Sequence, residues 1–256
     1  MESDRGGAPV RLVKLSHQFE LHGQMLPVLD EIDFAVGPSE CVALLGPSGC
    51  GKSTLLRLIA GLERPGSGRI FVSGNEIDGP DPSRILVFQD PTLYPWRTVR
   101  QNVALGPEAR GQLRAQGRRI DAVLRQVGLD GFDHAYPHQL SGGMAQRAAL
   151  ARALVNEPSV LLMDEPLANL DSLTRIAMQA ELMALWQRER FTAFLVTHDV
   201  EEALYLARRV LVLSHRPARI LADIAIDLPY PRHRGSAGFV ELRQQVLGEL
   251  GVQVDW

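Results

Sequence analysis

The amino-acid sequence predicts an α/β protein built around a largely parallel β-sheet that is covered on both faces. Residues 41–45, 159–163 and 192–196 are three short runs that are almost wholly apolar. Uninterrupted apolar runs of this length are typical of parallel strands that are buried on both faces. A segment with helical spacing follows each run, which indicates repeated strand–helix units.

Turn residues and periodicity define the other elements. Residues 10–19 and 28–36 alternate loosely, as hairpin strands do, and the strand pairs around the first apolar run suggest an antiparallel layer beside the parallel core. A Pro-Gly-Ser-Gly turn at 65–68 ends one helix, and two glycines weaken a later one. In chain order, strands are expected at residues 10–19, 28–36, 41–45, 69–73, 85–89, 159–163, 192–196, 209–213 and 220–226, and helices at 52–62, 99–105, 109–127, 143–155, 172–189, 200–207 and 239–250. Residues 1–9 are expected to be a flexible lead-in, and 134–140 a loop.

Composition limits the class of protein. The 256 residues suffice for one large α/β domain, and 45% hydrophobic with 22% charged residues is ordinary for a globular protein. The net charge is −3 without a basic block, so nucleic acid is not expected as a partner. No apolar run approaches the roughly 18 residues of a membrane-spanning helix, and the N-terminus lacks the build of a signal peptide. The two cysteines argue against a disulfide framework and favour a reducing cytosol.

A glycine-rich loop follows the strand at 41–45 and opens the helix at 52–62. It reads GPSGCGKST and fits the pattern G-x-x-x-x-G-K-[ST]. Such a loop points backbone N–H groups at phosphates, while Lys52 adds a positive charge and the Ser53 hydroxyl can bind Mg²⁺. A glycine-rich turn that binds nothing is the alternative, and the strand before and helix after the loop argue against it. The sequence therefore predicts a P-loop NTPase whose nucleotide-binding residues include Gly46, Pro47, Ser48, Gly49, Cys50, Gly51, Lys52, Ser53 and Thr54.

Cys50 lies inside this loop, where the glycines leave little cover. We expect its thiol to be more accessible than that of Cys41, which falls on a buried strand. In the alternative, the Cys50 side chain points into the protein and reacts slowly.

Asp164 and Glu165 directly follow an apolar strand. The carboxyl ends of strands face the ligand in nucleotide-binding α/β sheets. Asp164 is therefore placed to hold Mg²⁺, and Glu165 to polarise an attacking water, which suffices for phosphoryl transfer. A solvated strand end is the alternative for an isolated Asp-Glu pair.

Two further polar residues end predicted strands at the same edge of the sheet. His198 follows the strand at 192–196, where a contact with the γ-phosphate is plausible although a lone histidine is usually structural. Gln89 ends the strand at 85–89 and can reach Mg²⁺ or the attacking water. Its alternative role is that of a polar strand terminus.

The stretch LSGGMAQR at residues 140–147 is a second anion cradle, because a serine and two glycines open a helix. One nucleotide cannot easily use two cradles from one chain. A two-fold dimer solves this, since the cradle of one chain would face the phosphate loop of the other and two ATP molecules would be buried.

With these residues in order, the sequence resembles the nucleotide-binding subunit of an ABC transporter over about residues 10–227. The phosphate loop, Gln89, LSGGM, the strand VLLMDE at 160–165, the segment Ala-Asn-Leu-Asp ending at Asp171, and His198 all occur in family order. The resemblance implies a RecA-like parallel core with an antiparallel β subdomain and an inserted α-helical subdomain. It implies a core of residues 10–88 and 156–227, a helical subdomain of 89–155 and a C-terminal tail helix within 228–256.

The resemblance also implies an ATPase that uses ATP and Mg²⁺ and dimerises head to tail. Asp171 would communicate across the interface. The implied catalytic residues are Glu165, His198 and Gln89, and the implied Mg²⁺ ligands are Ser53, Gln89 and Asp164. Lys52, Ser53, Gln89, Asp164, Glu165 and His198 would act within one chain, and Ser141, Gly142 and Gly143 would act on the nucleotide of its partner.

A narrower resemblance joins the runs at 87–106 and 196–220 to the importers for nitrate, sulfonate and taurine. It implies membrane permease subunits as partners, an extracytoplasmic solute-binding protein acting indirectly, and a peripheral location at the cytoplasmic face of the membrane. In that group the segment after Gln89 docks onto the permease, which makes Tyr94 and Trp96 candidate docking residues. Packing within the helical subdomain is an equal alternative for both.

Some positions depart from the family pattern. Phe19 stands where the family has an adenine-stacking aromatic that is often Tyr, Met144 stands where Gln is common, and residues 167–169 are unusual. Other kinds of P-loop enzyme are disfavoured by the 140–147 stretch and by the lack of an N-K-x-D motif. Soluble ABC proteins of DNA repair or translation usually carry coiled-coil insertions, zinc cysteines or a second ATPase domain, and an exporter half would carry fused membrane helices.

Overall fold

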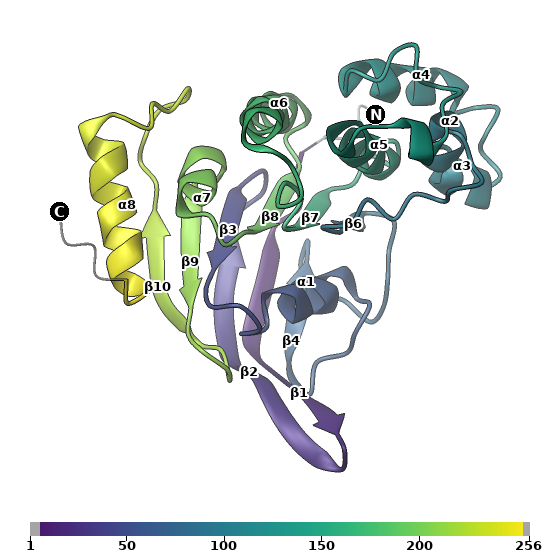
Figure 1. Ribbon diagram of the computed structural model, residues 1–256. Helices are drawn as coiled ribbons and strands as arrows, with labels where there is room; N and C mark the ends of the chain where they lie inside the picture. The colour runs from purple at the N-terminus through teal and green to yellow at the C-terminus, as the bar shows by residue number, and fades with distance from the viewer. Residues whose placement is uncertain (1–5, 253–256) are drawn as a thin grey trace.

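Two β-sheets and eight α-helices form the structure, a computed structural model that describes residues 6–252 (Figure 1). The six-stranded sheet has the order β10 (Ile220–Ala225), β9 (Arg209–Leu213), β3 (Cys41–Leu45), β8 (Thr192–Val196), β7 (Val160–Asp164), β6 (Arg84–Val87). The four-stranded antiparallel sheet has the order β2 (Gln24–Val36), β1 (Val10–Leu21), β4 (Ser67–Val72), β5 (Asn75–Glu76). The helices are α1 (Lys52–Ala60), α2 (Val99–Val103), α3 (Leu105–Ala109), α4 (Gly117–Gln126), α5 (Gly142–Leu154), α6 (Ser172–Glu189), α7 (Val200–Leu206) and α8 (Ala237–Glu249), with a 3₁₀ turn at Pro137–Gln139.

The parallel core forms as the apolar runs predict. All pairs between β6 and β9 are parallel, and only β10 joins antiparallel. Alternate residues of each buried strand enter two different cores: Ala43 packs with the helices above the sheet, and Leu44 packs with α1 and the antiparallel sheet below it. Apolar residues at every position are therefore required, because both faces of these strands are covered.

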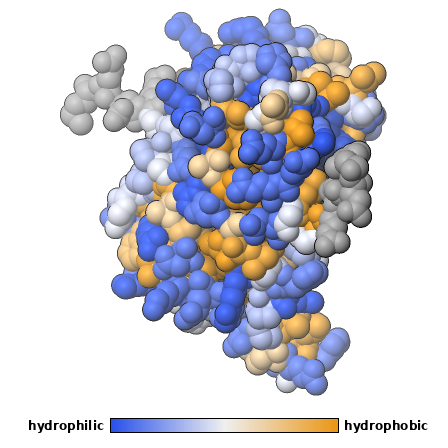
Figure 2. Space-filling view, turned by 90° about the vertical axis from the view of Figure 1, so that its left-hand side faces the viewer, coloured by the Kyte–Doolittle hydropathy of each residue, from blue (hydrophilic) through white to orange (hydrophobic). Residues whose placement is uncertain are grey.

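The first hairpin is longer than the predicted strands. Strand β1 continues to Leu21 and strand β2 begins at Gln24. A two-residue turn at His22 and Gly23, with φ values of 51° and 76°, joins them. Two positive φ values are characteristic of the tight turn that matches the twist of a hairpin. Residues 20–27, which lie between the two predicted strands and were expected to form a polar turn, are thus mostly strand. Figure 2 shows the tip of this hairpin projecting at the bottom of the molecule with apolar atoms on it.

The helical region between β6 and β7 differs from the prediction in two places. The expected helix at 99–105 is divided, because α2 ends at Val103 and α3 begins at Leu105. The expected single helix at 109–127 is broken: α3 ends at Ala109, Gly111 takes a φ of 69°, and α4 begins only at Gly117. A left-handed residue ends a helix, and glycine adopts it without a Cβ clash. Helices α2 to α5 lie together at one end of the sheet (Figure 1).

The chain before β1 is anchored where the structure describes it. The Gly7 amide donates to the Arg190 carbonyl at 2.8 Å, and Ala8 is buried. The expected flexible lead-in is therefore wrong for residues 7–9, while residues 1–5 and the last residues of the expected tail, 253–256, lie outside the described residues. Within residues 6–252, no helix is long and apolar enough to cross a membrane.

Both cysteines are buried, with exposed fractions of 4% for Cys41 and 1% for Cys50. The expected accessibility of Cys50 is wrong, because its sulfur points beneath the loop toward Gly46 rather than to solvent. A Cβ on Gly46 would lie 3.2 Å from that sulfur. Burial raises the pKa of the Cys41 thiol to about 12.

We therefore expect neither thiol of the folded protein to react quickly with an aromatic disulfide reagent. At pH 8 a thiol with a pKa of about 12 is ionised in roughly one molecule in 10⁴. Time courses in buffer and in denaturant, with Cys50→Ser to assign the signal, measure this. One fast thiol in buffer that MgATP protects would contradict the burial of Cys50.

Candidate active site

The phosphate loop connects β3 to α1 and requires glycine at its last position. Gly51 has a φ of 121°, and a Cβ there would lie 2.8 Å from Val28 and 2.9 Å from Leu29 of β2. The loop thus lies against the antiparallel sheet at a distance that only glycine permits. The α1 N-terminus behind it carries no acidic residue in its first turn, which leaves its positive end available for an anion.

Lys52 is folded over this loop. Its ammonium donates to the carbonyls of Gly46 at 2.8 Å and Pro47 at 2.9 Å, and the side chain is buried. The carbonyls satisfy the positive charge, which would be costly to bury alone. The ammonium is therefore held against the first two residues of the loop.

Ser53, in the first turn of α1, contacts Asp164 at the end of β7. The Ser53 hydroxyl donates to Asp164 Oδ1 at 2.9 Å. Burial raises the pKa of Asp164 and the Ser53 hydroxyl lowers it, while the charge of neighbouring Glu165 raises it further. A half-buried carboxylate beside a hydroxyl is a hard-oxygen pair of the kind that Mg²⁺ prefers.

The residues present therefore fit Mg²⁺ with few protein ligands. Within the described residues, no group of three His, Cys, Asp or Glu side chains could hold a metal ion alone. Mg²⁺ is commonly held by one or two protein oxygens together with phosphate oxygens and water.

Glu165 and His198 form the second pair of the site. His198 Nδ1 lies 3.1 Å from Glu165 Oε2, and the His198 side chain is 62% exposed. Glu165 has a φ of 46°, and its amide donates to the Val196 carbonyl at 2.9 Å. A left-handed conformation costs a non-glycine residue about 1–2 kcal/mol. In this conformation the Glu165 carboxylate lies next to His198, just past the end of β8.

Gln89 lies two residues past the end of β6, where its side chain is exposed and donates to Asn169 Oδ1 at 3.3 Å. Asn169 belongs to the segment that is unusual in the sequence, and its partnership with Gln89 was not predicted. No sequence signal points to this pair, because the two residues are far apart in the chain.

The 141–143 segment opens α5 as predicted. Ser141 is the N-cap, and its oxygen accepts from the Met144 amide at 3.3 Å. Gly143 also has a packing reason, since a Cβ there would lie 2.8 Å from Thr174 of α6. Among residues 6–252, no hydrogen bond joins this segment to the phosphate loop.

Asp171 caps the neighbouring helix α6. Its Oδ1 accepts from the Thr174 amide at 3.0 Å. The Thr174 side chain and then this amide lower the pKa of the carboxyl. The next turn of α6 presents two apolar side chains to solvent, with exposed fractions of 78% for Leu173 and 51% for Ile176.

Phe19 lies near the tip of the first hairpin and is 37% exposed. It pairs with Leu26 of β2, and its ring meets the His17 ring edge-on at 4.6 Å. Leu26 is two residues from Val28, against which the phosphate loop packs. At about 3.3 Å per strand residue, the backbone position of Phe19 lies roughly 7–10 Å along the hairpin from the loop.

An aromatic pair follows Gln89 on the surface of the helical region. The Tyr94 and Trp96 rings stack at 5.2 Å, and Trp96 is 70% exposed. Asn102 fixes the segment by accepting from the Tyr94 amide at 2.8 Å and donating to the Arg97 carbonyl at 3.1 Å. Trp96 is thus not a packing residue of the helical region, and it is presented on an ordered segment.

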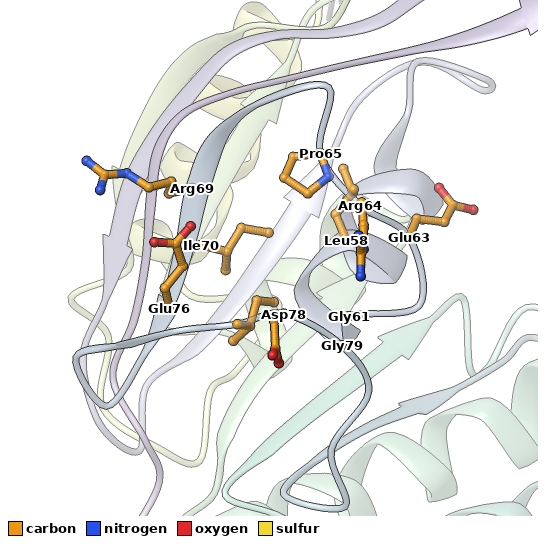
Figure 3. A pocket seen from close by; sticks show the side chains of 11 residues that line it. Leu58, Gly61, Glu63, Arg64, Pro65, Arg69, Ile70, Glu76, Asp78 and Gly79 are labelled. Atoms are coloured by element: carbon orange, nitrogen blue, oxygen red, sulfur yellow. The ribbon is translucent and has the colours of Figure 1, made fainter.

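A separate cavity of about 310 Å³ lies at the C-terminal end of α1, against β4 and β5 (Figure 3). It is lined by both acidic and basic side chains. Figure 3 shows Glu63 and Glu76 on opposite sides, with the Asp78 carboxylate pointing away from both. Because these groups do not converge, the cavity has no arrangement of ligand-binding atoms comparable with that around Ser53.

Comparison with known proteins places this arrangement in a family. The ABC transporter family model matches residues 29–168. The chain is 47% identical to an uncharacterized ABC transporter ATP-binding protein of Methanocaldococcus jannaschii, over 98% of this chain and 94% of that protein. It is 44% identical to the aliphatic sulfonates import ATP-binding protein SsuB of Bacillus licheniformis, over 87% of each.

One similar solved structure contains a nucleotide. A dimeric ATP-binding cassette in a post-hydrolysis state with ADP and Pi superposes with a TM-score of 0.73 and 26% identity, over 86% of this chain and all of that one. The fold is accordingly that of a P-loop NTPase with an antiparallel β subdomain and an inserted helical subdomain. With the phosphate loop, the Ser53–Asp164 pair and the Glu165–His198 pair in place, the chain belongs to the ABC transporter family and is an ATPase.

Proposed function

We propose that this chain is the ATP-hydrolysing subunit of an importer for nitrate, sulfonate, taurine or a similar small solute. The observation that carries the catalytic part is the pairing of Ser53 with Asp164 and of Glu165 with His198 at one edge of the sheet. The similarity to a sulfonate import protein along most of the chain supports the transport part. The division into a core of residues 10–88 and 156–227, a helical subdomain of 89–155 and a C-terminal tail is part of the same proposal.

Nucleotide binding uses the loop and the hairpin. The triphosphate lies on the loop of residues 46–54, and Lys52 exchanges its two carbonyl contacts for phosphate oxygens. Phe19 stacks on the adenine with the apolar face of its ring. Ser53, Asp164 and Gln89 would hold Mg²⁺, whose positive charge would offset the negative charge of the triphosphate.

Hydrolysis depends on the second pair. Glu165 accepts a proton from the attacking water as the water oxygen bonds to the γ-phosphorus and the bond to ADP breaks. His198 holds the carboxylate at 3.1 Å in the present structure and donates to the γ-phosphate from its exposed ring. Positioned charge is sufficient, because phosphoryl transfer requires little covalent assistance from the protein.

The active form in this proposal is a head-to-tail homodimer. Ser141, Gly142 and Gly143 of one chain contact the nucleotide of the other, and Asp171 lies at the interface. The exposed apolar side chains of Leu173 and Ile176 next to Asp171 support a covered surface there. The similar cassette that is dimeric with ADP and Pi supports a dimer.

The dimer would work at the cytoplasmic face of the membrane with permease subunits, and indirectly with an extracytoplasmic solute-binding protein. The ordered and exposed Tyr94–Trp96 pair supports a protein-docking surface, because aromatic side chains are enriched at such interfaces. Nucleic acid has no part in this function.

Replacing Glu165 with Gln should preserve ATP binding and lower turnover by roughly 10²–10⁴-fold, because the shape is kept and the proton acceptor is lost. Steady-state phosphate release and nucleotide affinity measure the two effects. Glu76→Gln, an exposed position on β5, is the matched control and should leave both unchanged. Near-normal turnover in Glu165→Gln would remove Glu165 from the role of general base.

Trp96→Ala should weaken assembly with the permease or uncouple transport while the isolated subunit stays folded and binds ATP. A central interface Trp commonly contributes about 2 kcal/mol or more to binding. Leu221→Ala is the control, since Leu221 is 55% exposed on β10 at the opposite edge of the sheet. Unfolding of the isolated Trp96→Ala subunit would instead make Trp96 a structural residue.

A mixed dimer should test the head-to-tail arrangement. Lys52→Ala damages the phosphate loop, and Ser141→Arg places bulk and charge in the signature segment, so each homodimer has two defective sites. In the mixed dimer one site carries both defects and the other is intact. The mixed dimer should therefore trap about one ATP, whereas each homodimer should trap almost none.

Nucleotide occlusion is the measurement for this mixture, because ATP turnover can require two competent sites together. Either variant occluding ATP normally as a monomer would rule out the shared site.

A further inference from the structure

Thr197 is a buried polar residue between the last residue of β8 and His198. Its exposed fraction is 2%. Its hydroxyl donates to Glu202 Oε2 and accepts from the Asp199 amide at 3.1 Å. Both hydrogen-bonding partners therefore lie on the far side of His198 in the chain.

Asp199 closes the same turn from the other direction. Its Oδ1 accepts from the amides of Glu201 at 2.9 Å and Glu202 at 3.1 Å, so that it caps α7. The six residues from Thr197 to Glu202 thus form a ring closed by a side-chain hydrogen bond. His198 is the member of this ring whose side chain points outward to Glu165.

Glu202 is unlike an ordinary first-turn glutamate, because it is only 4% exposed and its Oε1 is buried without a hydrogen-bond partner. Burial raises the pKa of this carboxyl, the Thr197 hydroxyl lowers it, the charge of Asp199 raises it, and the Gln179 side chain and the charge of Arg175 lower it by less, so that the pKa is raised overall. An ionised carboxylate with an unpaired buried oxygen is costly, whereas a neutral acid still accepts from Thr197. The balance raises the pKa of Glu202 and so favours the neutral form more than at an exposed glutamate.

We propose that Glu202 is a positioning residue for ATP hydrolysis: through Thr197 it fixes the backbone at His198 and thereby the contact of His198 with Glu165. The inference rests on the proposed roles of Glu165 and His198. Neither Thr197 nor Glu202 touches the nucleotide in this account. Their effect is on the geometry of the pair that assists the attacking water.

Glu202→Ala and Thr197→Val should each lower kcat by roughly 10- to 100-fold, since small displacements of catalytic groups have effects of that size. KM for ATP should stay within about twofold, because the loop that binds ATP is separate. Glu202→Gln should keep kcat near that of the wild type, since the amide oxygen still accepts from Thr197. The two damaging changes should not add in the double variant, because they break one contact.

Glu201→Ala is the matched control. Its carboxylate pairs with Arg243 at 2.9 Å, not with Thr197, and the Asp199 cap uses only its backbone amide. Full-length variants are compared by kcat, KM and thermal unfolding. A merely structural role would shift the unfolding temperature and leave kcat of the folded protein unchanged, which would overturn the proposal.

Two more outcomes separate this inference from the proposed function. If His198→Ala turns over ATP normally, the role of His198 itself fails. If His198→Ala is impaired while Thr197→Val has normal kcat, only the positioning role of Glu202 is wrong, and the role of His198 stands. If Glu202→Ala fails to fold, the same measurements on Thr197→Val decide the question. If Glu202→Gln is as inactive as His198→Ala, a hydrogen bond from Thr197 to an uncharged side chain at position 202 does not position His198, and the proposal is wrong.

Discussion

The register of three parallel strands is the constraint on which the site depends. Val196 of β8 lies beside Leu44 of β3 on one side and Asp164 of β7 on the other. The first residue of the phosphate loop, Glu165 and His198 each follow one of these three neighbouring residues by at most two positions, so they lie at the same edge of the sheet. A shift of one residue in either pairing would move a catalytic group by about 3.3 Å, and would also turn each strand's side chains to the opposite core.

The two cores enforce that register. Residues 42 and 44 of β3 enter the core shared with α1 and the antiparallel sheet, while residues 41, 43 and 45 enter the core beneath the other helices. Because both faces are filled, slippage would be opposed on both sides at once. The phosphate loop gains a second constraint from β2, which approaches Gly51 too closely for any side chain.

Helix α7 shows how buried polar groups serve the same edge of the sheet. Asp199 caps its N-terminus, and Arg232 binds its C-terminal carbonyls, donating to Leu204 O at 2.6 Å and also to Ala207 O. The Arg232 guanidinium lies 4.2 Å from the centre of the Tyr230 ring. A short helix of seven residues, which would be marginal alone, is thus held at both ends directly after His198.

The sequence by itself determined the parallel core, the antiparallel layer, the phosphate loop and the strand-end positions of Asp164, Glu165 and His198. Those features follow from local patterns, because burial on two faces demands apolar runs and a phosphate loop demands glycines at fixed spacing. Only the tertiary structure decided the burial of Cys50, the break at Gly111 and the length of the first hairpin, since each depends on what packs nearby. The contacts of Gln89 with Asn169 and of Thr197 with Glu202 were likewise decided by the fold. Gln89 and Asn169 are far apart in the chain, and only the folded chain brings them together. The Glu202 carboxyl accepts from the Thr197 hydroxyl because both are buried, whereas the sequence alone shows Glu202 only as an acidic residue in the first turn of a helix.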